Sequence, residues 1–207
     1  EGSKNSKGRA IQNLINIEQD DKVKAFICTQ DLKDDDYINN HYVIMATKMG
    51  QVKKTSLEQY SRPRSNGINA ITIKEGDELL EAKLTNGNSQ IMLAVKSGKA
   101  IRFEESKTRP MGRNASGVRG IRLKDNKDEV VGMISVNDMD ANILVVSENG
   151  YGKRSLLEDY RLTNRGGKGV KTISITSKTG QLVSLKSVTD SDDLMIINKS
   201  GIAIRMQ

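Results

Sequence analysis

Tryptophan is absent from this 207-residue chain, and aromatic side chains make up only 3% of it. Any hydrophobic core must therefore be built mainly from Ile, Leu, Val and Met. The same scarcity argues against a platform that stacks the bases of single-stranded nucleic acid, because such a platform needs successive aromatic side chains.

Sulfur and imidazole chemistry are equally limited. Cys28 is the one cysteine and His41 is the one histidine. A single cysteine excludes an intrachain disulfide framework and is typical of a reducing compartment. The sequence contains no Cys/His cluster with metal-ligand spacing, no Ser-His-Asp set and no P-loop. It therefore predicts a non-catalytic chain without a metal site or a cofactor of its own.

Long apolar runs are also missing. No run approaches the roughly 20 residues that a membrane-spanning helix requires. Residues 1–7 are polar and lack the apolar segment of a secretory signal peptide. We therefore expect a cytoplasmic protein without a membrane partner.

A repeated pattern dominates what the chain does contain. Each copy has an apolar run, a glycine and a second strand-like segment, with a basic residue four positions after the glycine. Strand, tight turn and strand is the pattern of a β-hairpin, in which glycine supplies the positive φ. The glycines recur after 48, 52 and 51 residues, and each is followed by its basic residue: Gly50 and Lys54, Gly98 and Arg102, Gly150 and Arg154, Gly201 and Arg205.

A second landmark keeps the same period, because Gly67, Gly117 and Gly169 each precede an alternating, strand-like segment. A period of about 50 residues made of hairpins predicts a propeller-like array with about four strands in each unit. Helix is expected only as short turns near residues 56–60 and 156–160, and residues 33–40 are expected to form a polar surface loop. The predicted fold is all-β, one array over residues 1–207, with the last strand of a truncated blade at 1–20, blades at 21–76, 77–127 and 128–179, and a truncated blade at 180–207.

Basic residues concentrate in one segment of each successive unit. The formal net charge is +7, and residues 59–74, 106–124 and 160–172 contain Lys and Arg but no Asp or Glu. Acidic residues gather instead at the turns that open each unit. An array with one basic segment in each blade carries a basic track along its rim.

Such a track suits the backbone of duplex DNA. Phosphates neutralised by Lys or Arg release counterions, which gives affinity without sequence preference and a steep salt dependence. Glycines beside the arginines allow backbone N–H groups to approach a phosphate, and the pattern contains no base-reading helix. The alternative interpretation is that these are solvated loop charges. The candidate DNA contacts are Arg9, Lys53, Lys54, Arg62, Arg64, Arg102, Lys107, Arg109, Arg113, Arg119, Arg122, Lys153, Arg154, Arg161, Arg165, Lys168 and Lys171.

These motifs, in this order and at this spacing, resemble the family of DNA gyrase A C-terminal domains. The likeness extends from about Lys7 to the end of the chain. Its carriers are residues 8–14, 45–47, 50–55, 64–67, 76–79, 109–113, 117–123 and 149–154.

The resemblance implies a β-pinwheel, a propeller-like disc of four-stranded blades in which neighbouring blades exchange strands. It also implies a non-catalytic role, in which double-stranded DNA bends around the basic rim and supports negative supercoiling. DNA cleavage, ATP and Mg would then belong to other parts of a bacterial A2B2 complex of gyrase A and gyrase B, at the nucleoid.

Two departures qualify the resemblance. The family's Gln-Arg-Arg-Gly-Gly-Lys-Gly box belongs to a first blade, of which the sequence holds only the last strand. Residues 164–169 are similar to that box but fall three units later, and we interpret them as a repeat-equivalent basic loop. With both end blades incomplete, we expect an open disc. The alternatives are the homologous C-terminal domain of topoisomerase IV and, in another class, a propeller that binds proteins.

Overall fold

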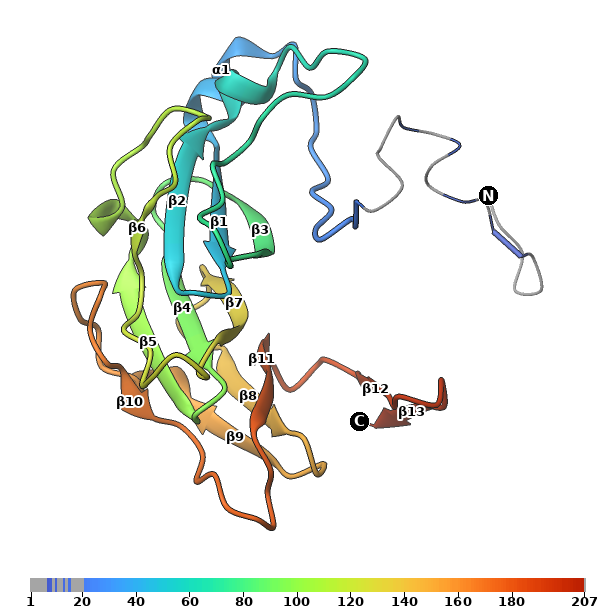
Figure 1. Ribbon diagram of the computed structural model, residues 1–207, viewed down its shortest axis with the longest axis vertical. Helices are drawn as coiled ribbons and strands as arrows, with labels where there is room; N and C mark the ends of the chain where they lie inside the picture. The colour runs from blue at the N-terminus through green and yellow to red at the C-terminus, as the bar shows by residue number, and fades with distance from the viewer. Residues whose placement is uncertain (1–6, 9, 11–12, 14, 16–20, 207) are drawn as a thin grey trace.

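The computed structural model describes residues 7–8, 10, 13, 15 and 21–206. Strands dominate the described chain, which confirms the all-β prediction (Figure 1). In chain order the elements are α1 (Asp35–Asn40), β1 (Tyr42–Thr47), β2 (Gln51–Ser56), η2 (Leu57–Tyr60), β3 (Leu79–Thr85), β4 (Gln90–Val95), β5 (Lys99–Glu104), η3 (Glu105–Lys107), β6 (Val118–Arg119), β7 (Val130–Val136), β8 (Asn142–Ser147), β9 (Gly152–Leu156), η4 (Leu157–Asp159), β10 (Val170–Lys171), β11 (Leu182–Val188), β12 (Leu194–Ile197) and β13 (Ala203–Met206).

The described strands form four antiparallel sheets, which we number from the N-terminal end. The first sheet has the order β3-β1-β2-β6, the second has β10-β5-β4-β7, the third has β11-β8-β9 and the fourth has β12-β13. The sheets follow one another along a crescent, and over the described residues they do not close into a ring (Figure 1). This is the propeller-type arrangement that the repeat predicts.

The predicted hairpins are confirmed. β1 pairs with β2, β4 with β5, β8 with β9 and β12 with β13. The four turn glycines all lie in the left-handed region, with φ between 80° and 83°: Gly50, Gly98, Gly150 and Gly201. Glycine is required here because other residues reach this region only with strain.

The first two sheets take their strands from successive sequence units. The first sheet combines the β1–β2 hairpin with β3 and β6, which lie beyond residue 77, and the second combines the β4–β5 hairpin with β7 and β10, which lie beyond residue 128. The blades therefore do not coincide with the predicted units 21–76, 77–127 and 128–179. Strand exchange between units interlocks neighbouring parts of the array.

The core lies between successive sheets, and β4 is buried on both of its faces. Ile91 and Leu93 pack in the cluster shared with the first sheet, whereas Met92 and Ala94 pack in the cluster shared with the third. Because successive side chains of a strand point to opposite faces, a strand between two cores must be apolar at every position. This explains the unbroken apolar run before the hairpin glycine.

Burial declines toward the C-terminal hairpin. β8 alternates between buried and half-buried positions, and the β12–β13 hairpin is largely exposed although its apolar run is similar. Met195 and Ile197 of β12 are exposed, whereas Met92 and Leu93 of β4 are completely buried. The apolar run alone therefore predicts the strand but not its burial.

Three local predictions are wrong. Residues 33–40 contain the short helix α1, because the Asp34 side chain accepts hydrogen bonds from the N–H groups of Asp36 and Tyr37 and caps it. The strand predicted after Gly67 does not form, and the predicted strands after Gly117 and Gly169 shrink to the two-residue strands β6 and β10.

The predicted turns near 56–60 and 156–160 are confirmed as η2 and η4. The last strand of a truncated blade, expected within residues 1–20, falls mostly outside the described residues. Within the described part of the chain, no helix has the length and apolar character that a membrane crossing requires.

Candidate nucleic-acid interface

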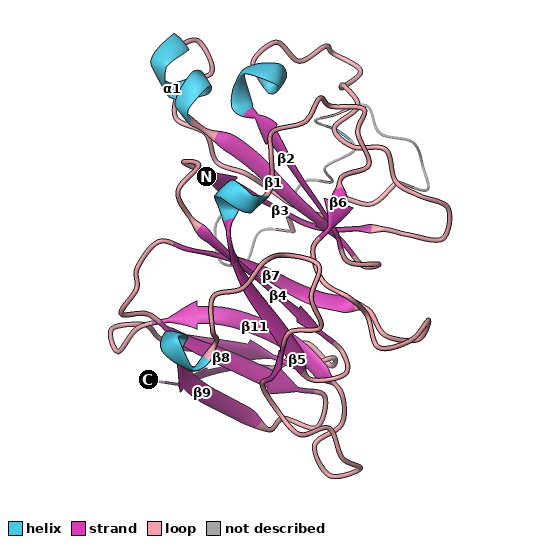
Figure 2. Cartoon of the chain, turned by 90° about the vertical axis from the view of Figure 1, so that its left-hand side faces the viewer, coloured by secondary structure: helices cyan, strands magenta, loops and turns pink. Residues whose placement is uncertain are grey.

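Three basic loops succeed one another along the row of sheets, one from each repeat. We call residues 61–74, 106–117 and 160–169 the rim loops. The second and third lie along the left-hand edge in Figure 1, and Figure 2 views that edge face-on. Each rim loop begins at or just after the short 3₁₀ turn that follows the second strand of a hairpin. The repeat therefore fixes the spacing of the rim loops along the chain.

The first and second rim loops are joined by hydrogen bonds. The Thr72 N–H donates to the Ala115 carbonyl at 3.3 Å, and the Thr72 hydroxyl donates to the Asn114 carbonyl at 2.7 Å. Residues 42 or more positions apart in the sequence are thereby held side by side. The two loops form one continuous surface.

The second and third rim loops are joined in the same way. The Arg165 guanidinium donates from Nε to the Lys107 carbonyl at 2.9 Å and from Nη1 to the Arg119 carbonyl at 3.1 Å. The Gly166 N–H donates to the Gly120 carbonyl at 2.6 Å. The basic track is therefore a hydrogen-bonded chain of loops rather than three separate projections.

Gly117 shows why the sequence allows this close approach. Its φ is +90°, and a Cβ atom at this position would lie 2.5 Å from the Val52 carbonyl oxygen of β2. Only glycine fits a left-handed residue pressed against a neighbouring backbone. The rim loop can therefore enter the first sheet as β6 directly after Gly117.

Most of the sequence-predicted contacts are exposed in the described chain. Arg113 and Arg165 are half-buried, and Arg9 lies outside the described residues. Arg154 is exposed but pairs with Asp190 at 2.6 Å. The exposed candidates are Arg62, Arg64, Lys107, Arg109, Arg119, Arg122, Lys153, Arg154, Arg161, Lys168 and Lys171.

Lys53, Lys54 and Arg102, which we call the hairpin cations, do not fit the predicted role. Lys53 is 0% exposed and Lys54 is 4% exposed. Arg102 is half-buried and lies in β5, between β4 and β10 of the second sheet. Their basic ends meet protein groups, so the prediction that they contact DNA is wrong.

Lys54 is the cation of a buried ion pair. Its Nζ lies 2.9 Å from Oε1 of Glu105, whose side chain is 0% exposed, and 4.1 Å from the centre of the Tyr42 ring. The same carboxylate accepts hydrogen bonds from the Thr85 hydroxyl at 2.7 Å and from the Ser89 N–H at 3.2 Å. A buried charge persists when it is paired and hydrogen-bonded in this way.

Arg102 occupies the same repeat position one unit later. Its Nη1 donates to the Leu157 carbonyl at 2.9 Å and to the Tyr160 carbonyl at 3.1 Å, and its Nε donates to Oε1 of Gln90 at 2.6 Å. Burial lowers its pKa below the usual value for arginine. The residue four positions after the glycine thus joins one unit to the 3₁₀ turn of the next.

Lys53 lies under the first two rim loops. Its Nζ donates to the carbonyl of Ala70 and, at 2.6 Å, to that of Arg113. Burial, and secondly the nearby Arg113 guanidinium, lower the pKa of Lys53 to about 8. Lys53 holds the loops together from beneath.

Sequence reasoning missed Lys99, at the start of β5, and Lys124, in the segment between β6 and β7, which line a cavity with Lys171. The cavity joins strands of different units, so no local sequence signal predicts it. Among the described residues, no group of three or more His, Cys, Asp and Glu side chains is placed to hold a metal ion.

Comparisons with known proteins agree with this architecture. A family described as DNA gyrase C-terminal domain, beta-propeller, matches residues 41–86, 90–137 and 141–189. The DNA gyrase A protein of Staphylococcus epidermidis (strain ATCC 12228 / FDA PCI 1200) is 44% identical over 205 residues, which cover 99% of this chain and 22% of that protein. The chain thus spans about a fifth of the length of the curated relatives it matches.

Two solved structures are similar in fold. The C-terminal domain of DNA topoisomerase IV superposes with a TM-score of 0.86 at 26% identity, covering 96% of this chain and 60% of that one. The DNA gyrase A C-terminal domain superposes with a TM-score of 0.82 at 25% identity, covering 97% of this chain and 65% of that one. Each family-matched segment contains one hairpin and the later strand that pairs with the first strand of that hairpin.

Proposed function

The chain belongs to the family of DNA gyrase C-terminal domains, and on this premise we propose that it binds duplex DNA along its rim loops and bends it into a wrap. The domain itself performs no catalytic step and uses no cofactor. The wrap supports negative supercoiling by a complete cytoplasmic gyrase at the nucleoid. The rest of gyrase A, together with gyrase B, supplies DNA cleavage and the ATP- and Mg-dependent steps.

The observation that carries this proposal is the continuity of the exposed basic track. Rim loops from successive units are hydrogen-bonded to one another, and all three are free of Asp and Glu. A duplex presents a phosphate charge about every 1.7 Å along its axis, so a continuous cationic surface can neutralise many phosphates at once. A curved track of this kind favours bending of the DNA toward the protein.

The recognition we propose is independent of sequence. The rim loops, all within the described residues, carry no helix that could enter a major groove. The exposed groups are guanidinium and ammonium groups, together with the backbone of glycine-containing loops, and these suit phosphate oxygens rather than base edges. DNA deformability is then the remaining source of preference.

Binding to duplexes of increasing length, titrated with salt, tests the proposal. We expect affinity to rise with length until the duplex covers the track, and log K to fall steeply with log salt. Short and long duplexes of equal affinity would contradict wrapping. Salt-independent binding, or no binding at low salt, would overturn the basic track and favour the protein-binding alternative.

A topology assay addresses a second candidate function, which is substrate selection in topoisomerase IV. The high structural similarity to that enzyme's C-terminal domain favours it, whereas the 44% identity to DNA gyrase A favours wrapping. Circular DNA is relaxed by a type I topoisomerase with the protein bound and is then deproteinised. We expect retained positive supercoils if the protein wraps DNA, and a fully relaxed product if it only binds.

A further inference from the structure

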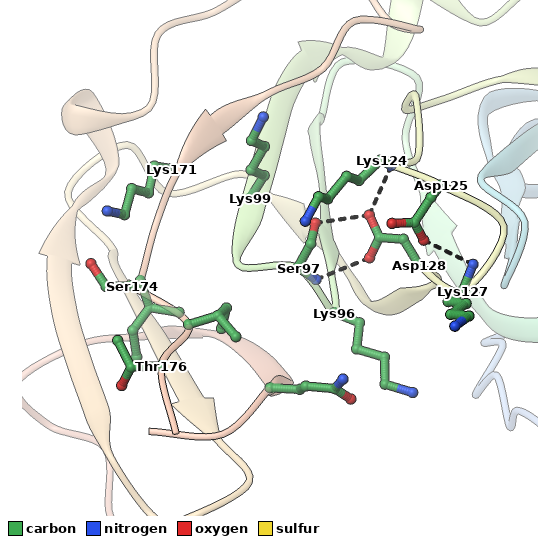
Figure 3. A pocket seen from close by; sticks show the side chains of 13 residues that line it. Lys96, Ser97, Lys99, Lys124, Asp125, Lys127, Asp128, Lys171, Ser174 and Thr176 are labelled. Atoms are coloured by element: carbon green, nitrogen blue, oxygen red, sulfur yellow. Dashed lines mark hydrogen bonds between the residues drawn. The ribbon is translucent and has the colours of Figure 1, made fainter. Parts of the chain in front are cut away.

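A basic cavity lies beside the β4–β5 turn, where three segments of the chain meet. Its volume is about 690 Å³, and its walls come from the turn itself, from residues 124–128 and from residues 171–176 (Figure 3). The lining contains five lysines and two aspartates: Lys96, Lys99, Lys124, Lys127, Lys171, Asp125 and Asp128. The lining is therefore strongly cationic.

Two of these lysines oppose each other across a strand pair. Lys99 in β5 is the direct antiparallel partner of Lys171 in β10. Like charges directly opposite each other in a sheet are destabilising. Among the described residues, no carboxylate lies within salt-bridge distance of Lys99, Lys124 or Lys171. Within the described chain, the fold holds these three lysines, and Lys127 as well, around one cavity without a salt bridge to any of them.

The aspartates of the cavity already have partners. Asp128 is buried, and its carboxylate accepts hydrogen bonds from the Ser97 N–H at 2.9 Å, the Ser97 hydroxyl at 2.8 Å and the Lys124 N–H at 3.0 Å. Figure 3 shows this group fixing the turn at one side of the cavity. Asp125 accepts from the Lys127 N–H at 2.9 Å. Asp128 thus serves to shape the cavity wall that Lys124 borders.

The corresponding place in the first sheet supplies an internal comparison. There β2 pairs with β6, and the partners are Gln51 and Arg119 in place of Lys99 and Lys171. The fold therefore accepts a neutral residue at this position of the hairpin. A lysine in the second sheet is not a requirement of the repeat, which points to a ligand.

We propose that Lys99, Lys124 and Lys171 form an anchoring site for a phosphate group, and that its ligand is a phosphodiester of bound duplex DNA. The inference rests on the proposed function and adds residues outside the rim loops to it. The site joins the track through β10, which follows the third rim loop directly. The hydroxyls of Ser174 and Thr176 border the same cavity and supply donors besides the ammonium groups.

The double variant Lys99→Gln/Lys171→Gln tests the site in the whole chain. Removing two phosphate contacts should make the slope of log K against log salt shallower by about 1.8. The melting temperature at low salt should stay equal or rise, because the variant loses a like-charge pair. A structural role for the lysines would instead lower it. Lys33→Gln/Lys186→Gln is the matched control, since both lysines are exposed and lie outside the cavity and the rim loops.

Inorganic pyrophosphate distinguishes a DNA site from a site for a free phosphate. An unchanged DNA slope in the cavity variant overturns the inference while the proposed function stands. If pyrophosphate stabilises the wild-type protein but not that variant while the slope is unchanged, the site takes a free phosphate instead. Failure of the wild-type protein to bind duplex at low salt overturns the proposed function and the inference together. A slope change equal to that of the control variant overturns the inference as well.

Discussion

The hairpin cations and the rim-loop cations are lysines and arginines alike, but they have different surroundings and different roles in the structure. Lys54 and Arg102 stand inside sheets and join one unit to the turn of the next, through Glu105 or through backbone carbonyls. Arg109 and Lys168 lie in rim loops and are exposed. The comparison teaches that a recurring basic residue is a candidate for DNA contact only where the strand pattern leaves its side chain in solvent.

Exposure follows from the position in the repeat. A residue of a central strand has neighbours on both faces, so a cation there must find a partner inside the protein. A loop that follows a hairpin strand has solvent on one side, and its cations keep their hydration until a ligand replaces it. Four sets of variants test this division.

The largest effect is expected for Lys54→Ala. Glu105 would be left buried and unpaired, which costs about 3–5 kcal/mol of unfolding free energy. Denaturant unfolding measures this loss. The salt dependence of DNA binding by the folded variant should match that of the wild-type protein. A shallower slope would mean that Lys54 contacts DNA, and it would contradict the separation of hairpin cations from rim-loop cations.

A charge-free replacement serves as the control for that experiment. In Lys54→Met/Glu105→Gln both charges are removed, the glutamine carbonyl accepts the hydrogen bond of the Ser89 N–H, and the glutamine amide donates to the Thr85 hydroxyl, which can accept as well as donate. Removal of a whole buried pair is far less destabilising than removal of one partner. The double variant should therefore regain most of the lost stability.

The second prediction concerns the place where a rim loop enters a sheet. Gly117→Ala should cost about 1–2 kcal/mol for the left-handed backbone and about 1–3 kcal/mol more for the contact with the Val52 carbonyl. Gly67→Ala is the matched control, because Gly67 has a φ of +76° and open space around a Cβ atom. Equal losses in the two variants would contradict the close approach.

The sequence predicts the hairpins and the basic loops, but it does not predict which basic residues are buried and which are exposed. The hairpins and their period follow from apolar runs and glycines, since both are local signals. The acid-free segments likewise predicted the exposed rim loops. The burial of Lys53 and Lys54 depends on packing between distant segments, and the Lys99–Lys171 pair depends on strand exchange between units. Such contacts join residues far apart in the sequence, so the local sequence pattern does not predict them.

The third prediction addresses the rim-loop cations themselves. Arg109→Gln/Arg161→Gln/Lys168→Gln should make the salt slope of DNA binding shallower by about 2.7, since three phosphate contacts are lost. Stability should change by no more than about 0.5 kcal/mol, because the three side chains are exposed. Slope and melting temperature are measured on the same samples. A large loss of stability with an unchanged slope would reverse the roles of the two groups.

The fourth prediction is a pH dependence that arises from Lys53. Burial lowers its folded-state pKa to about 8, from a usual value of 10.5. Between these two values the unfolded chain binds more protons than the folded chain, so the contribution of Lys53 to stability rises with pH and is complete above the upper value. Below about pH 8 both states are protonated and the contribution is constant. Subtracting the unfolding free energy of Lys53→Met from that of the wild-type protein isolates it. A difference that stays flat from about pH 7 to 10 would mean that the Lys53 ammonium is solvated as freely as a rim-loop cation.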